Sequence, residues 1–281
     1  MLEAGLMKKI GILFHPKIPA AEALAHDLAK RLAHFEASAW LCSAWDEGGA
    51  KDKAPGTDLI LSIGGDGTML RAARVAAPLS IPILGINLGH LGYMIELTAE
   101  EVWDKMPRLL AGGGWLDERA MLEARLPSQG GSFQALNDVV VARGARARVI
   151  RVQAAIDGEP LTVYKCDGVI VATATGSTGY SLAAGGPILY PRAKELLLTP
   201  ISAHLSLAAP LVFPPETVLE LEVRTEEQAL LSIDGQIEVE LNDGDLVEVR
   251  RSPYVTRLLR TQPPAFFYRT LTERLSGKWG Q

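Results

Sequence analysis

Residues 59–75 read LILSIGGDGTMLRAARV: an apolar run, a glycine-rich turn, and then apolar residues at helical spacing. The run at 59–63 predicts a buried strand, and residues 68–75 predict a helix with Thr68 as its N-cap. Between them, Gly64, Gly65 and Gly67 leave backbone amides that no Cβ covers. The stretch therefore predicts an anion-binding turn, because the free amides and the helix dipole both favour negative charge.

Strands and helices alternate on both sides of this stretch, up to about residue 115. Helical spacing covers residues 20–35 and 100–111. Such alternation predicts a parallel sheet with helices on both faces. The triplet Gly112-Gly113-Gly114 ends the last helix and is the predicted domain boundary. Further strands are predicted at residues 10–14, near Trp40 and at residues 81–86.

The remainder of the chain is rich in short β segments separated by turn signals such as Asp157-Gly158 and Asp234-Gly235. This pattern predicts an antiparallel, sandwich-like domain. Residues 265–275 return to helical spacing and are expected to pack back on the first domain. The predicted fold class is therefore α/β plus all-β, with an α/β domain at 1–114, a β-rich domain at 115–262 and a C-terminal helix within 263–281. The predicted strands are 121–126, 133–142, 149–156, 161–171, 218–223, 229–233, 237–241 and 246–250.

Composition limits the partners that the chain can have. Its 281 residues, 48% of them hydrophobic, are enough to bury a large core, and a net charge of −5 argues against nucleic acid as a partner. No apolar run is long enough to cross a bilayer and no signal peptide is evident, so no membrane partner is expected. Cys42 and Cys166 give no disulfide framework and no cluster has zinc spacing, so a cytoplasmic location and no metal-ligating residues are expected.

Asp66 is the acidic residue of the anion-binding turn. A carboxylate repels phosphate, but it suits this position if it accepts the proton of a substrate hydroxyl while the amides and a divalent cation hold the phosphates. The alternative is a tight turn in which Asp66 only caps the helix. The chain has no Gly-x-x-x-x-Gly-Lys-Ser/Thr loop, and its first βα turn, Phe14-His15-Pro16, has no Gly-x-Gly-x-x-Gly. Neither a P-loop enzyme nor an ordinary dinucleotide-binding Rossmann domain is therefore supported.

Five further strings follow the GGDGT of residues 64–68 in a fixed order. They are NLGHLGY at 87–93, LNDV at 136–139, DGVIVAT at 167–173, TGSTGYSLAAGGP at 175–187 and DGQ at 234–236. The ordered series resembles the NAD kinase family. The GGDGT string alone is shared with diacylglycerol and sphingosine kinases, and the string at 175–187 separates the resemblance from them.

The resemblance implies roles for particular residues. It implies that Asp66 is the base acting on the 2′-hydroxyl of the adenosine ribose of NAD. The phosphoryl donor, ATP or polyphosphate, would lie on the loop formed by Gly64, Gly65, Gly67 and Thr68. It further implies Mg²⁺ or another divalent cation held mainly through donor phosphates, and a homodimer or homotetramer. The NAD-binding residues that it implies are Asp66, Gly67, Asn137, Asp138, Arg148, Lys165, Asp167, Thr175, Thr178, Gly179, Tyr180, Ser181, Leu182, Ala183 and Gln236.

Several alternatives remain open at the level of sequence. The pair Asn137-Asp138 also fits an Asx turn that ends a strand. The arginines at 143, 146, 148 and 151 also fit a solvated strand face. His90, inside a glycine loop, is the histidine expected nearest a ligand. At the level of function, the alternatives are a lipid or sugar kinase that shares the GGDGT motif and a noncatalytic dinucleotide sensor.

Overall fold

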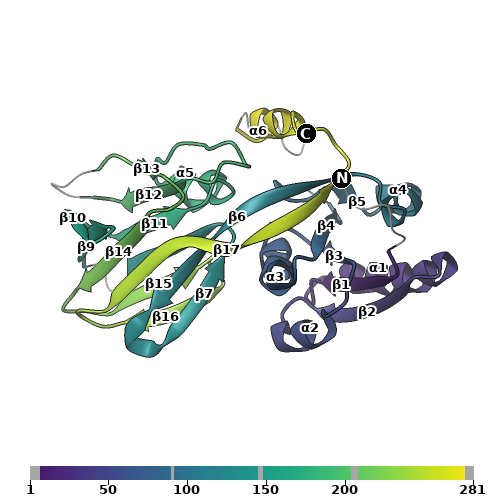
Figure 1. The fold of residues 1–281 in the computed structure, drawn as a ribbon, viewed down its shortest axis with the longest axis horizontal. Coiled ribbons are helices and arrows are strands. Elements are labelled where there is room, and N and C mark those ends of the chain that lie inside the picture. Colours follow the sequence, from purple (N-terminus) through teal and green to yellow (C-terminus); the bar gives the residue numbers. More distant parts are fainter. Residues whose placement is uncertain (1–6, 90–91, 145–147, 204–207, 276–281) are drawn as a thin grey trace. The chain divides into compact units, whose positions relative to one another are not determined.

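The computed structural model describes residues 7–89, 92–144, 148–203 and 208–275 (Figure 1). His90 and Arg146, both singled out in the sequence, lie outside these ranges. The chain divides into two compact units: the first runs up to Glu118 and resumes at Thr256, and the second covers Arg119–Val255. No helix in the described ranges is long and apolar enough to cross a membrane.

The first unit contains a parallel sheet with strand order β2-β1-β3-β4. Helix α1 begins with Pro19, whose missing N–H costs nothing at the first helical position. The strands and helices are β1 (Lys9–Phe14), α1 (Pro19–Leu32), β2 (Ser38–Ser43), α2 (Glu47–Lys53), β3 (Leu59–Ile63), α3 (Asp66–Ala76), β4 (Pro82–Asn87), β5 (Leu97–Thr98), α4 (Glu101–Leu110) and α6 (Phe266–Leu275).

Helices cover both faces of this sheet, as the alternating pattern predicts. Buried residues of α1 and α4 pack with Ile10, Ile12 and Leu61 in one core cluster. Helix α3 covers the opposite face, where the Met69 sulfur would lie 3.0 Å from a Cβ added to Gly85. The carboxyl ends of β1, β2 and β3 therefore lie at one edge of the sheet, next to the start of α3.

The second unit is a sandwich of two sheets. One sheet has the order β13-β12-β11-β8-β15-β16, and the other includes the run β10-β9-β14-β17. Side chains from both sheets, among them Val139, Val141, Val152 and Leu221, form one buried core. Strands β6 and β17 each extend across the boundary between the units. The elements are β6 (Trp115–Leu126), β7 (Gly131–Ala135), β8 (Asp138–Arg143), β9 (Ile150–Ile156), β10 (Glu159–Cys166), β11 (Gly168–Ala172), the 3-10 turn η4 (Gly176–Thr178), α5 (Tyr180–Ala183), β12 (Leu196–Ile201), β13 (Leu211–Phe213), β14 (Val218–Arg224), β15 (Ala229–Ile233), β16 (Ile237–Leu241) and β17 (Leu246–Arg260).

The predicted fold class is confirmed, but some predicted strands are wrong in detail. The single strands expected at 133–142 and 161–171 are each two strands, interrupted at Leu136-Asn137 and at Asp167. Strand β17 continues ten residues beyond its predicted end, from Arg250 to Arg260. Helix α2 and strands β12 and β13 had no predicted counterpart. Both interruptions include a residue that the resemblance assigns to NAD binding, namely Asn137 and Asp167.

Candidate active site

The glycine turn lies at the carboxyl end of β3, and Asp66 is the first residue of α3. A Cβ added to Gly64 would lie 2.3 Å from the Thr68 hydroxyl oxygen, so the turn closes this tightly only with glycine. The prediction that Thr68 caps the helix is wrong, because Gly65 is the N-cap residue and no side chain caps it. The Thr68 hydroxyl is instead buried inside the first turn, where it has no hydrogen-bond partner in the described part of the chain.

The Asp66 carboxylate accepts two backbone hydrogen bonds from a segment far along the chain. The amide of Tyr93 donates to Oδ2 at 3.0 Å, and the amide of Met94 donates to Oδ1 at 3.1 Å. Gly92 lies so close that a Cβ there would be 2.0 Å from Oδ1. These contacts orient the carboxylate through amides of residues outside α3. An aspartate that only capped the helix would not need them.

A second carboxylate, Asp234, organises the predicted NAD-binding turn at Asn137-Asp138. Its oxygens accept the amides of Leu136, Asn137 and Asp138 at 3.0, 2.7 and 3.1 Å. Asp234 belongs to the DGQ string at 234–236, and the family resemblance assigned it no role. The Asn137 amide oxygen is buried and has no hydrogen-bond partner among the residues that the structure describes, so the Asn137 side chain does not form the Asx turn that was the alternative. An unpaired buried acceptor is costly, which favours a ligand partner here.

The loop of residues 173–178 packs directly on Asn137. The Thr173 amide donates to the Asn137 carbonyl at 2.9 Å, and a Cβ on Gly176 would lie 2.1 Å from that same oxygen. A side chain at residue 176 would therefore separate the two predicted NAD-binding segments. Gly176 is therefore needed for close packing, apart from any contact of this string with a ligand.

A cavity of about 390 Å³ lies over β8, β15 and β16 of the second unit. Val140, Ala142 and Leu230 give it an apolar lining, while Asp138 and Tyr180 are among its polar lining residues. Burial, reinforced by the charge of Asp234, raises the pKa of Asp138 to about 7. Near neutral pH this carboxyl group is therefore partly protonated and can donate as well as accept a hydrogen bond.

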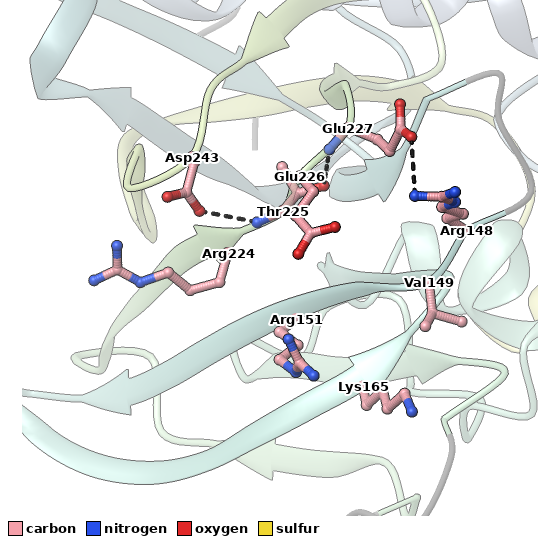
Figure 2. Close-up of a pocket in the computed structure, with 9 residues that line it drawn as sticks. All are labelled: Arg148, Val149, Arg151, Lys165, Arg224, Thr225, Glu226, Glu227 and Asp243. Atoms are coloured by element: carbon pink, nitrogen blue, oxygen red, sulfur yellow. Dashed lines mark hydrogen bonds and ion pairs between the residues drawn. The ribbon is translucent and has the colours of Figure 1, made fainter.

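A second cavity, of about 340 Å³, gathers the predicted residues Arg148 and Lys165 with Arg151 and Arg224 (Figure 2). Arg148 forms an ion pair with Glu227 at 3.3 Å. Lys165 and Arg151 lie on paired positions of β10 and β9. Acidic side chains, including Glu226 and Asp243, also line this cavity. The structure thus places Arg148 and Lys165 in a different cavity from Asp138 and Tyr180.

The remaining predicted residues have mostly internal partners. Asp167 pairs with Arg143 at 2.9 Å, and Thr175 accepts a hydrogen bond from Arg119 at 3.3 Å. Ser181 shares a buried hydrogen bond with Thr199 at 2.9 Å. The other predicted residues lie in one loop and one turn. Thr178, Gly179, Leu182 and Ala183 lie in or beside η4 and α5, and Gln236 follows the Asp234-Gly235 turn.

A carboxylate held by amides beside a glycine turn, at the carboxyl edge of a parallel sheet, is an arrangement suited to phosphotransferases. Comparison with known proteins narrows this class. Residues 6–114 match the family model described as the ATP-NAD kinase N-terminal domain, and residues 136–261 match the ATP-NAD kinase C-terminal domain. The chain belongs to the NAD kinase family, and the resemblance noted in the sequence is confirmed.

Individual relatives and solved structures agree with this assignment. A NAD kinase of Dehalococcoides mccartyi is 46% identical over 276 residues, covering 97% of both chains. A NAD kinase of Chloroflexus aurantiacus is 40% identical over 273 residues, covering 96% of this chain and 99% of the relative. Yeast NADH kinase complexed with NADH is similar in structure, with a TM-score of 0.85, 25% identity and coverage of 97% and 88%. An Archaeoglobus fulgidus NAD kinase in complex with ATP gives a TM-score of 0.75, 26% identity and coverage of 95% and 98%.

The contact between Gly92 and Asp66 leads to a first prediction. Gly92→Ala should lower kcat for phosphoryl transfer about 100-fold, because the new methyl group displaces the carboxylate that it would otherwise overlap. Gly89→Ala is the matched control, since a Cβ there meets no described atom within 4 Å. Steady-state kinetics on both purified variants, with circular dichroism as a check of folding, measure the effect. Equal kcat values for the two variants would contradict the prediction.

The raised pKa of Asp138 leads to a second prediction, about stability. Because the folded-state pKa of Asp138 is about 7 and its reference value is 3.8, the contribution of this group to stability is largest below pH 3.8 and is lost as the pH rises through 7. The asparagine side chain of the Asp138→Asn variant cannot ionise, so the variant does not lose stability in this way as the pH rises. Relative to wild type, the variant should gain up to about 4 kcal/mol of unfolding free energy between pH 4 and pH 8. Urea unfolding at both pH values measures this gain, and parallel pH dependences for the two proteins would show that Asp138 does not titrate in this range.

Proposed function

We propose that the chain transfers the γ-phosphoryl group of ATP to the 2′-hydroxyl of the adenosine ribose of NAD, giving NADP. The observation that carries the proposal is the Asp66 carboxylate, fixed by two backbone amides beside the glycine turn. Support comes from the relatives named NAD kinase and from the similar structures complexed with NADH and with ATP.

In the proposed reaction Asp66 accepts the proton of the 2′-hydroxyl. The freed oxygen forms a bond to the γ-phosphorus, and the bond between this phosphorus and the β–γ bridging oxygen breaks, so that ADP leaves with the electron pair. The amides of the glycine turn and the N-terminus of α3 hold the donor phosphates. Polyphosphate could occupy the same turn, since the amides recognise phosphate oxygens and not a nucleoside.

Residues of the second unit bind NAD in this proposal. The buried Asn137 oxygen, which has no hydrogen-bond partner among the described residues, accepts a hydrogen bond from the dinucleotide, and Asp138, partly protonated near neutral pH, can donate one. The apolar lining of the neighbouring cavity suits an aromatic base. The cavity that contains Arg148 and Lys165 offers cations for an anionic portion of the same ligand.

Mg²⁺ or another divalent cation is proposed as the cofactor. Among the described residues, no group of three or more His, Cys, Asp or Glu side chains could hold a metal ion. Both oxygens of Asp66 accept hydrogen bonds from amides. These features suit a cation that is held mainly by donor phosphate oxygens and water, where it would neutralise the charge of the phosphates.

We also propose a homodimer or homotetramer in the cytoplasm. The oligomer follows from the family resemblance, and light scattering coupled to gel filtration tests it. The location is supported by the two cysteines, Cys42 and Cys166, which are both buried and unpaired, as in a reducing compartment.

Regiochemistry gives the sharpest test of the proposed function. Incubation with NAD, ATP and Mg²⁺ should yield NADP. The NAD analogue with a 2′-deoxyadenosine should bind competitively without being phosphorylated, whereas the 3′-deoxy analogue should still be a substrate, because the proposed mechanism has Asp66 act on the 2′-hydroxyl. Mass spectrometry of the products distinguishes the outcomes. A phosphorylated 2′-deoxy product would place the reaction at another oxygen, and binding without any turnover would indicate a dinucleotide sensor.

Replacement of the base gives a further prediction. Asp66→Asn should lower kcat by about 10²- to 10⁴-fold, while Kd for NAD changes only a few-fold, because the base acts in the transition state. Asp58→Asn is a matched control: Asp58 also accepts two backbone amides, those of Lys8 and Lys9 at 2.7 and 2.8 Å, but it precedes β3. Kinetics and calorimetric binding compare the two variants. A similar small loss of kcat in both variants would show that Asp66 has a structural role and does not act as the base.

A further inference from the structure

Arg260, the last residue of β17, is buried and binds the backbone of the segment that contacts Asp66. Its Nη1 donates to the carbonyl oxygens of Met94 at 3.0 Å and Ile95 at 3.4 Å, and its Nη2 donates to that of Tyr93 at 3.4 Å. One guanidinium group thus binds three consecutive carbonyl groups. The planar fork of an arginine can do this, whereas the single ammonium group of a lysine cannot reproduce it.

The same segment holds Asp66 through its amides. The peptide group between Tyr93 and Met94 is bound at both ends: its carbonyl accepts from Arg260 and its N–H donates to Asp66. A cation at the carbonyl polarises the peptide group and strengthens the hydrogen bond that the N–H donates. The chain of contacts from Arg260 to the carboxylate therefore passes through a single peptide group.

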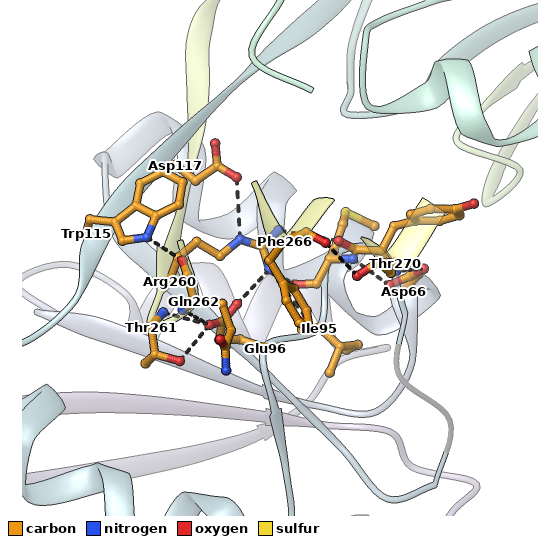
Figure 3. Close-up of polar contacts among 12 residues, drawn as sticks. Asp66, Ile95, Glu96, Trp115, Asp117, Arg260, Thr261, Gln262, Phe266 and Thr270 are labelled. Atoms are coloured by element: carbon orange, nitrogen blue, oxygen red, sulfur yellow. Dashed lines mark hydrogen bonds and ion pairs between the residues drawn. The ribbon is translucent and has the colours of Figure 1, made fainter. Parts of the chain in front are cut away.

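The position of Arg260 is fixed in turn by two buried carboxylates. Figure 3 shows Arg260 with Asp117 on one side and Glu96 on the other, at 3.4 and 3.2 Å. The second oxygen of Glu96 accepts the amides of Thr261 and Gln262 at 2.6 and 2.8 Å. The side chains of Arg260, Glu96 and Asp117 are at most 9% exposed. Burying three charges adds little net stability, so stability alone does not account for this cluster.

We propose that Arg260 is a positioning residue for Asp66. It fixes segment 93–95, and the amides of this segment then hold the carboxylate in the orientation that accepts the proton of the substrate hydroxyl. This proposal rests on the proposed function, in which Asp66 is the base. The competing explanation is that Arg260 only stabilises the first unit.

The experiment compares Arg260→Lys with Arg257→Lys. Arg257 lies three residues earlier on the same strand, binds Glu118 at 3.2 Å and the Ser80 carbonyl at 3.4 Å, and does not touch segment 93–95 in the contacts described. Arg260→Lys should lower kcat about 10- to 100-fold with KM for NAD and ATP within about threefold, because orientation of the base affects the transition state more than substrate binding. Arg257→Lys should change neither quantity.

A double-mutant cycle with Asp66→Asn separates positioning from stability. Without the carboxylate there is nothing for Arg260 to orient, so Arg260→Lys should have no further effect on the residual kcat of Asp66→Asn. An equal loss in both backgrounds, or an unchanged kcat in a folded Arg260→Lys protein, would overturn the proposal. If lysine at this position prevents folding, Glu96→Gln loosens the same guanidinium, and it should lower kcat while KM stays constant.

The wild-type reaction distinguishes failure of this inference from failure of the proposed function. Phosphorylation of NAD at an oxygen other than the 2′-hydroxyl would refute the proposed regiochemistry, and the effect of Arg260→Lys would still be measured on that reaction. A folded wild-type protein that transfers no phosphoryl group would overturn both proposals. An active wild type with no coupling between residues 260 and 66 would overturn the inference alone.

Discussion

The two hydrogen bonds from the amides of Tyr93 and Met94 to Asp66 are the contacts on which the candidate site depends. They join the start of α3 to a segment that follows β4, so the orientation of the carboxylate is a property of the tertiary fold and not of the glycine turn alone. Gly92 allows the approach, and Arg260 holds the far side of the same segment. Conformational freedom is thereby removed from the carboxylate before any substrate binds.

The second unit uses a carboxylate in a comparable way. Asp234 binds three successive amides at the interruption between β7 and β8, and this arrangement holds Asn137 and Asp138 where the two strands separate. The negative charge of Asp234 also contributes to the raised pKa of Asp138, although burial is the larger cause. One residue therefore both shapes the turn and favours the protonated state of its neighbour.

Sequence patterns predicted the motif-bearing segments well and missed what depends on distant partners. The alternation of strands and helices before residue 115 and the GGDGT turn correctly predicted the α/β half of the chain, because both patterns involve residues that are close together in the sequence. The runs around Asn137 and Asp167 are apolar on both sides, so periodicity gave no sign that two strands meet there. Strand β12 contains Pro200, which argues against a strand, and in the structure β13 pairs only with residues 196–198 of β12. Arg260 lies 194 positions after Asp66, and no pattern in the sequence around it indicated that it contacts the segment next to Asp66.

Hydrogen bonds to a carboxylate do not by themselves mark a reactive group. Asp58, Asp66 and Asp234 all accept two or more backbone amides, yet Asp58 joins the start of β1 to the residue before β3, and Asp234 holds a turn together. The environment of Asp66 differs because a glycine packs directly against it: a Cβ at Gly92 would overlap the carboxylate. This glycine allows a tight support behind the carboxylate. Rigid support is what a positioned base requires, and of these three carboxylates Asp66 is the one in a glycine turn at the carboxyl edge of the sheet.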